Sequence, residues 1–187
     1  MIFRNLIKIF TLFLILSLSP VYASVLKFAQ ISDIHYQPKA PQNEKSFKLK
    51  YYSLNILDDA LDQIKDEKNV KFILVTGDAA DLPNAEDFDF IYKYLNKNCP
   101  KKWYYTLGNH DVSPKGLKKP DQVKLLNDNE KKEFKDGKTY YSFKPQRDMT
   151  FIALDGNYDT KKTSQGYLPP EQLKFTDETI SKAKDDV

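Results

Sequence analysis

Three short apolar segments, separated by two amphipathic helical segments, constrain the fold of this 187-residue chain more than any other feature. The apolar segments cover residues 25–32, 70–76 and 103–107, and apolar residues recur at helical spacing over 46–65 and 83–97. Strands that are apolar along nearly their whole length are typically buried on both faces, as in a parallel sheet with crossover helices. The sequence therefore predicts an α/β fold that begins with a parallel strand–helix–strand–helix–strand unit.

The rest of the chain predicts a hairpin followed by one more helix. A helix is expected over residues 121–135, and two strands, 139–143 and 149–154, are expected to be joined around Pro145. Pro169 and Pro170 favour the start of a last helix that continues to about residue 184. Because no linker divides these segments, we expect a single domain over residues 24–187.

The first 23 residues have the pattern of a secretory signal peptide. Arg4 and Lys8 give a positive start, residues 9–18 form an apolar run too short to span a bilayer, and Val21-Tyr22-Ala23 offers a cleavage site. We expect a mature chain that begins near Ser24, is periplasmic or secreted, and keeps no stable membrane anchor. An uncleaved anchor is the alternative.

The charge balance of the mature chain gives no sign of a polyanionic partner. The chain has 29 basic and 26 acidic residues, and Arg4 and Lys8 lie in the predicted signal peptide, so the mature chain is nearly neutral. A protein that binds nucleic acid usually carries a basic patch or a strongly basic domain. We therefore expect no nucleic-acid partner.

Polar motifs follow each of the three predicted strands. The first strand leads into Asp33-Ile34-His35, the second into Gly77-Asp78-Ala79-Ala80-Asp81, and the third into Gly108-Asn109-His110-Asp111. The carboxyl ends of parallel strands lie on one edge of the sheet, so residues far apart in sequence meet there. Asp33 and His35 are two residues apart, and on an extended segment their side chains would point to the same side.

These motifs supply carboxylate, carboxamide and imidazole groups, which suit cations such as Mn, Fe or Zn. The absence of thiolates argues against a structural zinc site. Each motif alone also occurs as an ordinary turn or helix cap. The occurrence of all three in order, each directly after an apolar strand, favours a metal centre.

The three motifs resemble the first signature blocks of the calcineurin-like metallophosphoesterase superfamily, over about residues 26–184. Within it the chain is most similar to the bacterial cyclic-nucleotide phosphodiesterase-like branch, while the segment from Ile31 to Tyr36 is also similar to the acid-sphingomyelinase-like branch. The resemblance implies an α+β sandwich of two sheets flanked by helices. It also implies two divalent metal ions at the strand ends and a small-molecule phosphate ester as substrate.

Transferred to this sequence, the resemblance implies four metal ligands. Asp33 and His35 would hold the first ion, Asp78 would bridge both ions, and Asn109 would bind the second ion through its side-chain oxygen. Two cations in such a site can stabilise both the attacking and the leaving oxygen of a phosphoryl transfer.

The resemblance also implies two catalytic residues that are not ligands. His110 would face the substrate and stabilise or protonate the leaving oxygen, and Asp111 would accept a hydrogen bond from His110 and hold its ring. Asp81 receives no ligand role from the resemblance and is expected at most to steady its loop.

The later signature blocks of the family supply three more histidines, whereas this chain contains only His35 and His110. We therefore expect the chain to be the N-terminal portion of such an enzyme, truncated before the remaining ligands. The predicted function is metal-dependent hydrolysis of phosphate mono- or diesters. The alternatives are a catalytically inactive remnant of such an enzyme and a sphingomyelinase-like phosphodiesterase.

Overall fold

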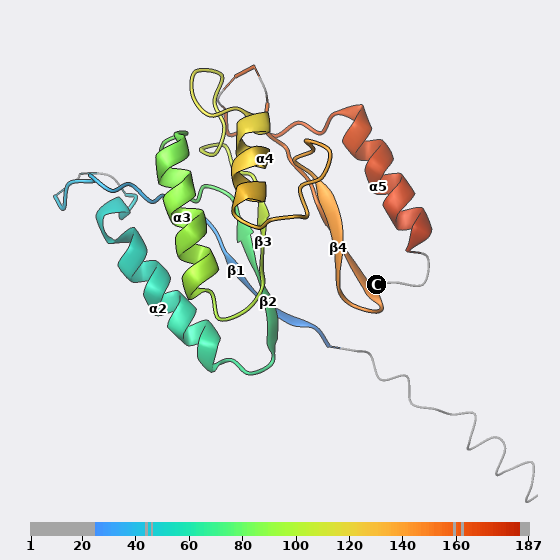
Figure 1. Ribbon diagram of the computed structural model, residues 1–187, viewed down its shortest axis with the longest axis horizontal. Coiled ribbons are helices and arrows are strands. Elements are labelled where there is room, and N and C mark those ends of the chain that lie inside the picture. Colours follow the sequence, from blue (N-terminus) through green and yellow to red (C-terminus); the bar gives the residue numbers. More distant parts are fainter. Residues whose placement is uncertain (1–24, 44, 46, 159, 162, 184–187) are drawn as a thin grey trace, which may run out of the picture.

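The computed structural model describes residues 25–43, 45, 47–158, 160–161 and 163–183 (Figure 1). The predicted signal peptide, residues 1–23, lies outside the described residues. Among the helices that are described, none is both long enough and apolar enough to cross a membrane.

The first half of the domain is the predicted parallel unit. Strands β1, β2 and β3 form one parallel sheet in that order. The crossovers are formed by the short 3₁₀ helix η1 with α2, and by α3 (Figure 1). The bounds are β1 Lys27–Ile31, η1 Lys50–Tyr52, α2 Ser53–Asp66, β2 Val70–Thr76, α3 Ala85–Asn98 and β3 Trp103–Thr106.

The start of α3 illustrates how local sequence sets these elements. Asn84 is the N-cap, and its side-chain oxygen accepts a hydrogen bond from the backbone N–H of Asp87 at 2.9 Å. Such a cap satisfies one of the N–H groups that the first helical turn leaves unpaired. The helix then buries Phe88, Ile91 and Leu95 against the sheet, which is the apolar face that its periodicity predicts.

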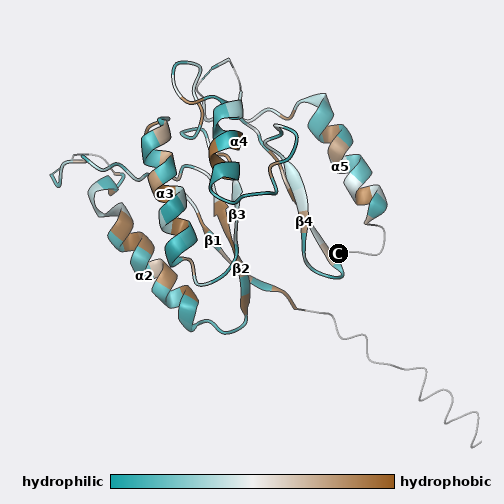
Figure 2. Ribbon diagram, viewed as in Figure 1, coloured by the Kyte–Doolittle hydropathy of each residue, from teal (hydrophilic) through white to brown (hydrophobic). Residues whose placement is uncertain are grey.

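The second half adds the predicted hairpin, which packs on the sheet face opposite the helices. Strands β4 (Tyr141–Gln146) and β5 (Met149–Ala153) pair antiparallel. The ring centroids of Tyr104 and Phe143 lie 3.6 Å apart, and those of Phe72 and Phe151 lie 5.3 Å apart. Figure 2 shows the hydrophobic residues on the central strands and in bands along α2 and α3. The architecture is therefore the expected sandwich of two sheets flanked by helices.

The structure corrects two predicted boundaries in the second half. Helix α4 spans Lys119–Asp128 rather than 121–135, because Glu130 takes a left-handed conformation at φ 67° and the chain turns there. Pro145 lies inside β4 rather than in the connection, and the turn falls at Arg147 and Asp148. The pairing of β4 with β5 is irregular beside Pro145, which accommodates a residue that cannot donate a ladder hydrogen bond.

Strand β1 differs from the prediction that every strand is buried on both faces. Its residues are exposed or half-buried, whereas β2 and β3 are mostly buried. Strand β1 lies at one edge of the three-stranded sheet, and Phe28 remains partly exposed although it stacks on Phe72. Helix α5, Pro170–Lys182, lies beyond the hairpin and apart from the other helices (Figure 1).

A tyrosine hydroxyl pairs with the backbone of β3. The hydroxyl of Tyr141 accepts a hydrogen bond from the N–H of Tyr105 at 3.1 Å and donates one to its carbonyl at 2.7 Å.

Replacing Tyr141 with phenylalanine leaves both buried groups unpaired, so we expect a loss of about 1–3 kcal/mol in unfolding free energy. Urea denaturation measures this loss. The exposed Tyr167→Phe serves as the control, and equal stability of the two variants would contradict the prediction.

Lys131 should make the stability depend on pH. It is buried, its ammonium lies 3.5 Å from the centroid of the Trp103 ring, and burial lowers its pKa to about 8. The unfolded chain keeps the ordinary pKa of about 10.4 and so binds more protons between the two values. Stability from this residue should therefore rise with pH from about 8 to 10.4. Lys131→Met should abolish that rise in urea titrations at several pH values, and the exposed Lys132→Met should preserve it.

Candidate metal centre

The loops after β1 and β2 continue the pairing of the strands themselves. The N–H of His35 donates to the carbonyl of Asp78 at 2.9 Å, and the N–H of Tyr36 donates to Ala79 at 3.0 Å. A third bond runs in the opposite direction: the N–H of Asp81 donates to the carbonyl of Tyr36 at 3.0 Å. The first two polar motifs are therefore held side by side by backbone hydrogen bonds, as expected for adjacent parallel strands.

The backbone of these motifs is not extended. Asp33, His35 and Asp78 all have left-handed conformations, with φ of 58°, 48° and 53°. The side chains of Asp33 and His35 do converge, but the alternation of an extended strand is not the reason. Non-glycine residues in this region are strained, and such strain concentrates at functional sites because the surrounding structure holds it.

The two motif glycines allow the loops after β2 and β3 to touch. A Cβ atom on Gly77 would lie 2.4 Å from the backbone nitrogen of Gly108, and one on Gly108 would lie 2.2 Å from Oδ1 of Asp78. Gly77 also has a φ of 83°. Any larger residue at either position would push the third motif away from Asp78.

The first group of candidate ligands contains Asp33, His35 and Asp78. Nε2 of His35 lies 3.5 Å from Oδ1 of Asp33 and 3.9 Å from Oδ2 of Asp78. One donor atom of each residue lies within 4.8 Å of the others, which is a spacing that a single cation can bridge. His35 and Asp78 are buried, whereas the Asp33 side chain is 64% exposed, so the group opens to solvent on one side. Two carboxylates and an imidazole suit a divalent transition-metal ion.

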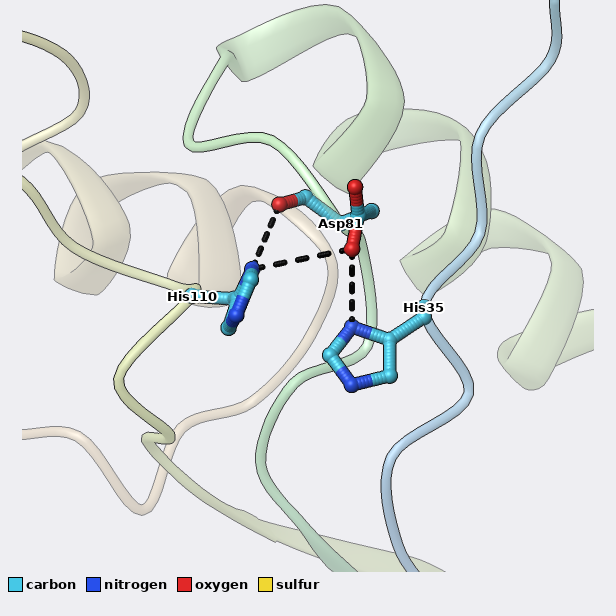
Figure 3. Close-up of side chains that lie close together, drawn as sticks. All are labelled: His35, Asp81 and His110. Atoms are coloured by element: carbon cyan, nitrogen blue, oxygen red, sulfur yellow. Dashed lines mark hydrogen bonds and ion pairs between the residues drawn. The ribbon is translucent and has the colours of Figure 1, made fainter. Parts of the chain in front are cut away.

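Asp81 organises a second group with His35 and His110 (Figure 3). Its Oδ1 lies 3.2 Å from Nδ1 of His35, which turns Nε2 of that ring toward Asp33 and Asp78. A carboxylate that holds the far nitrogen of a ligating histidine is a common support for metal sites. Nδ1 of His110 lies 2.6 Å from the carbonyl of Asp81 and 3.7 Å from its carboxylate. Since a carbonyl only accepts, this nitrogen carries the proton.

The sequence interpretation missed this role of Asp81. It assigned the orientation of His110 to Asp111, and the structure places that function on Asp81 instead. The only sequence signal for this role was the position of Asp81, three residues after Asp78. In the structure the N–H of Asp81 bonds to the carbonyl of Tyr36, and its side chain lies next to both histidines (Figure 3).

Asp111 is fully buried and supports the loops. Its Oδ2 accepts hydrogen bonds from the Tyr105 hydroxyl at 2.6 Å, the N–H of Gly108 at 2.6 Å and the N–H of Asp78 at 3.2 Å. Burial raises its pKa to about 8, against the opposing effect of the Tyr105 hydroxyl. Asp111 therefore joins the second motif to the third through its buried side chain. Among the described residues, Nδ1 of the His110 ring bonds to Asp81 and not to Asp111.

Asn109 and Asp78 occupy the positions from which the resemblance derives a second ion. Asn109 lies in the turn directly after Gly108 and is half-buried. Oδ1 of Asp78 accepts a hydrogen bond from the N–H of His110 at 2.8 Å, while Oδ2 faces His35. The two carboxylate oxygens of Asp78 thus point toward different motifs.

A second network, for which no sequence signal was found, fixes the start of the third motif. The side-chain amide of Asn157 donates to the carbonyl of Leu107 at 3.0 Å and to Asp155 at 2.8 Å. Asp155 is fully buried and is paired with Lys119 at 3.0 Å. The loop after β5 is thereby attached to the residue that precedes Gly108.

Two lysines place positive charge over Asp81. Nζ of Lys48 lies 3.2 Å from its Oδ1, and Nζ of Lys50 lies 3.3 Å from its Oδ2. Burial by itself would raise the pKa of Asp81, but the hydrogen bonds and charges of the two lysines outweigh it, and the pKa lies below the usual value. Burial, aided by Lys48, lowers the pKa of His35. Both effects favour an ionised carboxylate beside a neutral imidazole, which is the state that binds a metal.

The family model of calcineurin-like phosphoesterases matches residues 26–185, which is most of the chain. The chain belongs to the calcineurin-like phosphoesterase family. No curated protein matches the sequence. Members of this family act on small-molecule phosphate esters and use divalent metals, and the Asp33, His35 and Asp78 group is one that could hold such an ion. The match covers all three motifs and also the hairpin and α5.

The contact between the loops gives a direct test of the site geometry. Gly108→Ala inserts a methyl group against the backbone and carboxylate of Asp78, so we expect a loss of about 1–3 kcal/mol in unfolding free energy and weaker Mn²⁺ binding. The matched control is Gly156→Ala, where the nearest atom to the new Cβ is 3.7 Å away. Urea denaturation and metal titration measure both effects. Unchanged metal binding by Gly108→Ala would contradict the role assigned to this contact.

Proposed function

We propose that this phosphoesterase hydrolyses phosphate mono- or diesters with a divalent metal held by Asp33, His35 and Asp78. The observation that carries the proposal is the orientation of His35. Its Nδ1 faces the carboxylate of Asp81 at 3.2 Å, and its Nε2 faces the two other acidic side chains. Three carboxylates therefore lie near one imidazole ring, an arrangement that suits metal binding better than simple core packing.

A divalent cation bound there supplies Lewis acidity, which neutralises phosphoryl charge and makes water more acidic. The protein holds the donors in place, because the backbone bonds between the loops position Asp33 and Asp78 where both face Nε2 of His35. The exposed side chain of Asp33 leaves one side of the group open to a substrate from solvent.

His110 is suited to act on the leaving oxygen. Its Nδ1 donates to the carbonyl of Asp81, so the other ring nitrogen, Nε2, is directed away from the backbone. Its ring packs edge-on against that of His35, with centroids 4.8 Å apart. When both nitrogens of the ring are protonated, Nε2 can give its proton to the leaving oxygen while Nδ1 keeps its hydrogen bond to Asp81, which is general acid catalysis. The ring of His110 is thus fixed next to the metal ligands without being one of them.

We further propose that Asp78 and Asn109 contribute to a second ion. The half-buried Asn109 side chain and the two differently directed oxygens of Asp78 support this role. The donor set suits Mn, Fe or Zn, and the identity of the ion is to be measured by elemental analysis.

Substitution of the acidic residues tests the function. With added Mn²⁺, Asp78→Asn should abolish hydrolysis of p-nitrophenyl phosphate and bis-p-nitrophenyl phosphate, because it removes a ligand charge. Asp81→Asn should lower Mn²⁺ affinity by about 10–100-fold, because it weakens the support of His35. The control is Asp59→Asn on the exposed surface of α2. Hydrolysis that survives both chelation and Asp78→Asn would refute the proposal.

A further inference from the structure

A cavity of about 380 Å³ opens directly beside the candidate metal centre. It lies between the end of β1 with its following loop and the first turns of α2. Asp33 and His35 form part of its wall, so the cavity and the first ligand group share residues. Ligand-binding clefts for small molecules commonly have volumes of about 300–1,000 Å³. The cavity is thus large enough for one organic group attached to a phosphate.

The end of the cavity near the metal ligands is polar and carries two lysines beside the carboxylates of Asp33 and Asp81. Lys48 and Lys50 both line it. Nζ of Lys48 lies 3.1 Å from Nε2 of His110 and 3.4 Å from Nδ1 of His35. An ammonium group in this place is next to the nitrogen that we assign to the leaving oxygen. A phosphate bound between the metal ligands and His110 would therefore meet at least one lysine.

Apart from Ser32 and Ser53, the rest of the cavity is lined by apolar residues. Its wall is formed by Ile31, Phe47, Leu49, Ile56, Leu57 and Ala60. Leu57 is buried, whereas Leu49 is 62% exposed and Ile56 is 49% exposed. A cluster of exposed large apolar side chains next to a polar centre is typical of a surface that binds an apolar partner. Removing such side chains from water stabilises the bound state by about 25 cal/mol per Å².

We propose that this cavity holds the organic group of the substrate, and that the preferred substrates are phosphate esters of an aryl or medium-length alkyl alcohol. The proposal rests on the proposed function and adds the substrate class to it. The position of the metal ligands and the lysines at one end of the cavity fixes the orientation. The anionic phosphate lies at the end with Lys48 and His35, and the apolar group extends along α2 toward Ile56 and Ala60.

Non-hydrolysable phosphonates test the substrate class without any need for turnover. Calorimetry on the full chain, with and without Mn²⁺, would compare methylphosphonate, hexylphosphonate and phenylphosphonate. We expect the hexyl and phenyl compounds to bind at least about 10-fold more tightly than methylphosphonate, because they bury apolar surface. Equal affinity for all three would overturn the proposal. A preference for the apolar compounds without phosphate ester hydrolysis would support the cavity and count only against the proposed function.

Two substitutions separate the apolar wall from general damage. Ile56→Glu places a charge at the mouth of the cavity and Ala60→Leu fills it, so each should remove most of the preference for hexyl and phenyl compounds while methylphosphonate binding is unchanged. The matched control is Ile180→Glu on α5, where an isoleucine is 59% exposed and does not line the cavity. Preference that persists in both cavity variants, or that is lost equally in the control, would overturn the proposal.

Substitution of a lysine at the polar end of the cavity should change phosphonate affinity in a different way. Lys48→Met should weaken the binding of all three phosphonates by a similar factor and leave the preference among them intact, whereas Lys174→Met on α5 should change neither the affinities nor the preference.

Analytical ultracentrifugation of the wild type and Ile56→Glu provides the remaining test. If the wild type is a dimer that Ile56→Glu dissociates, the apolar wall is an interface between copies and the substrate assignment is wrong.

Discussion

The structure depends above all on backbone hydrogen bonds that continue past the ends of β1 and β2. The bonds from His35 to Asp78 and from Tyr36 to Ala79 keep two polar loops in register where strands would normally diverge. The contact between Gly77 and Gly108 then brings the third loop to the same place. With these loops fixed, a few side chains suffice to build a site. Asp33, His35 and Asp78 all have left-handed conformations, and the two carboxylates meet at Nε2 of His35. The energy that holds those conformations comes from the buried sheet below, in which Ile73 and Val75 are fully buried.

Asp111 is a buried residue that supports the loops of the candidate site. A fully buried carboxylate is costly unless several donors surround it. Its Oδ2 receives two backbone N–H groups and the Tyr105 hydroxyl, and these donors come from the second motif, the third motif and β3. Removing it would leave the N–H groups of Asp78 and Gly108 unpaired at the point where the two loops touch. A residue far from solvent can therefore control the geometry of the candidate site, because its hydrogen bonds hold the backbone of Asp78 and Gly108.

The sequence predicted the central elements well because their signals are strong and local. The run of β-branched residues gave β2 at its observed bounds, and the order of strands with polar ends placed three motifs on one edge. What escaped prediction depends on backbone geometry that periodicity does not encode. The end of α4 near Glu130, the roles of Asp81 and Asp111, and the approach of Lys48 all follow from left-handed residues or from hydrogen bonds between distant loops. The exposure of β1 likewise depends on its position in the sheet rather than on its composition.

Asp81 couples the parts of the site to one another. One of its oxygens faces Nδ1 of His35, its backbone carbonyl accepts from His110, and its carboxylate also pairs with two lysines that line the cavity. A change in this residue would thus alter the orientation of the candidate ligand His35, the ring of His110 and the positions of the two lysines together. Such effects are not additive, because they share a single partner. Variants of Lys48 and His110 should accordingly be interpreted in pairs with Asp81, since a double-mutant cycle separates their direct contribution from displacement of the shared carboxylate.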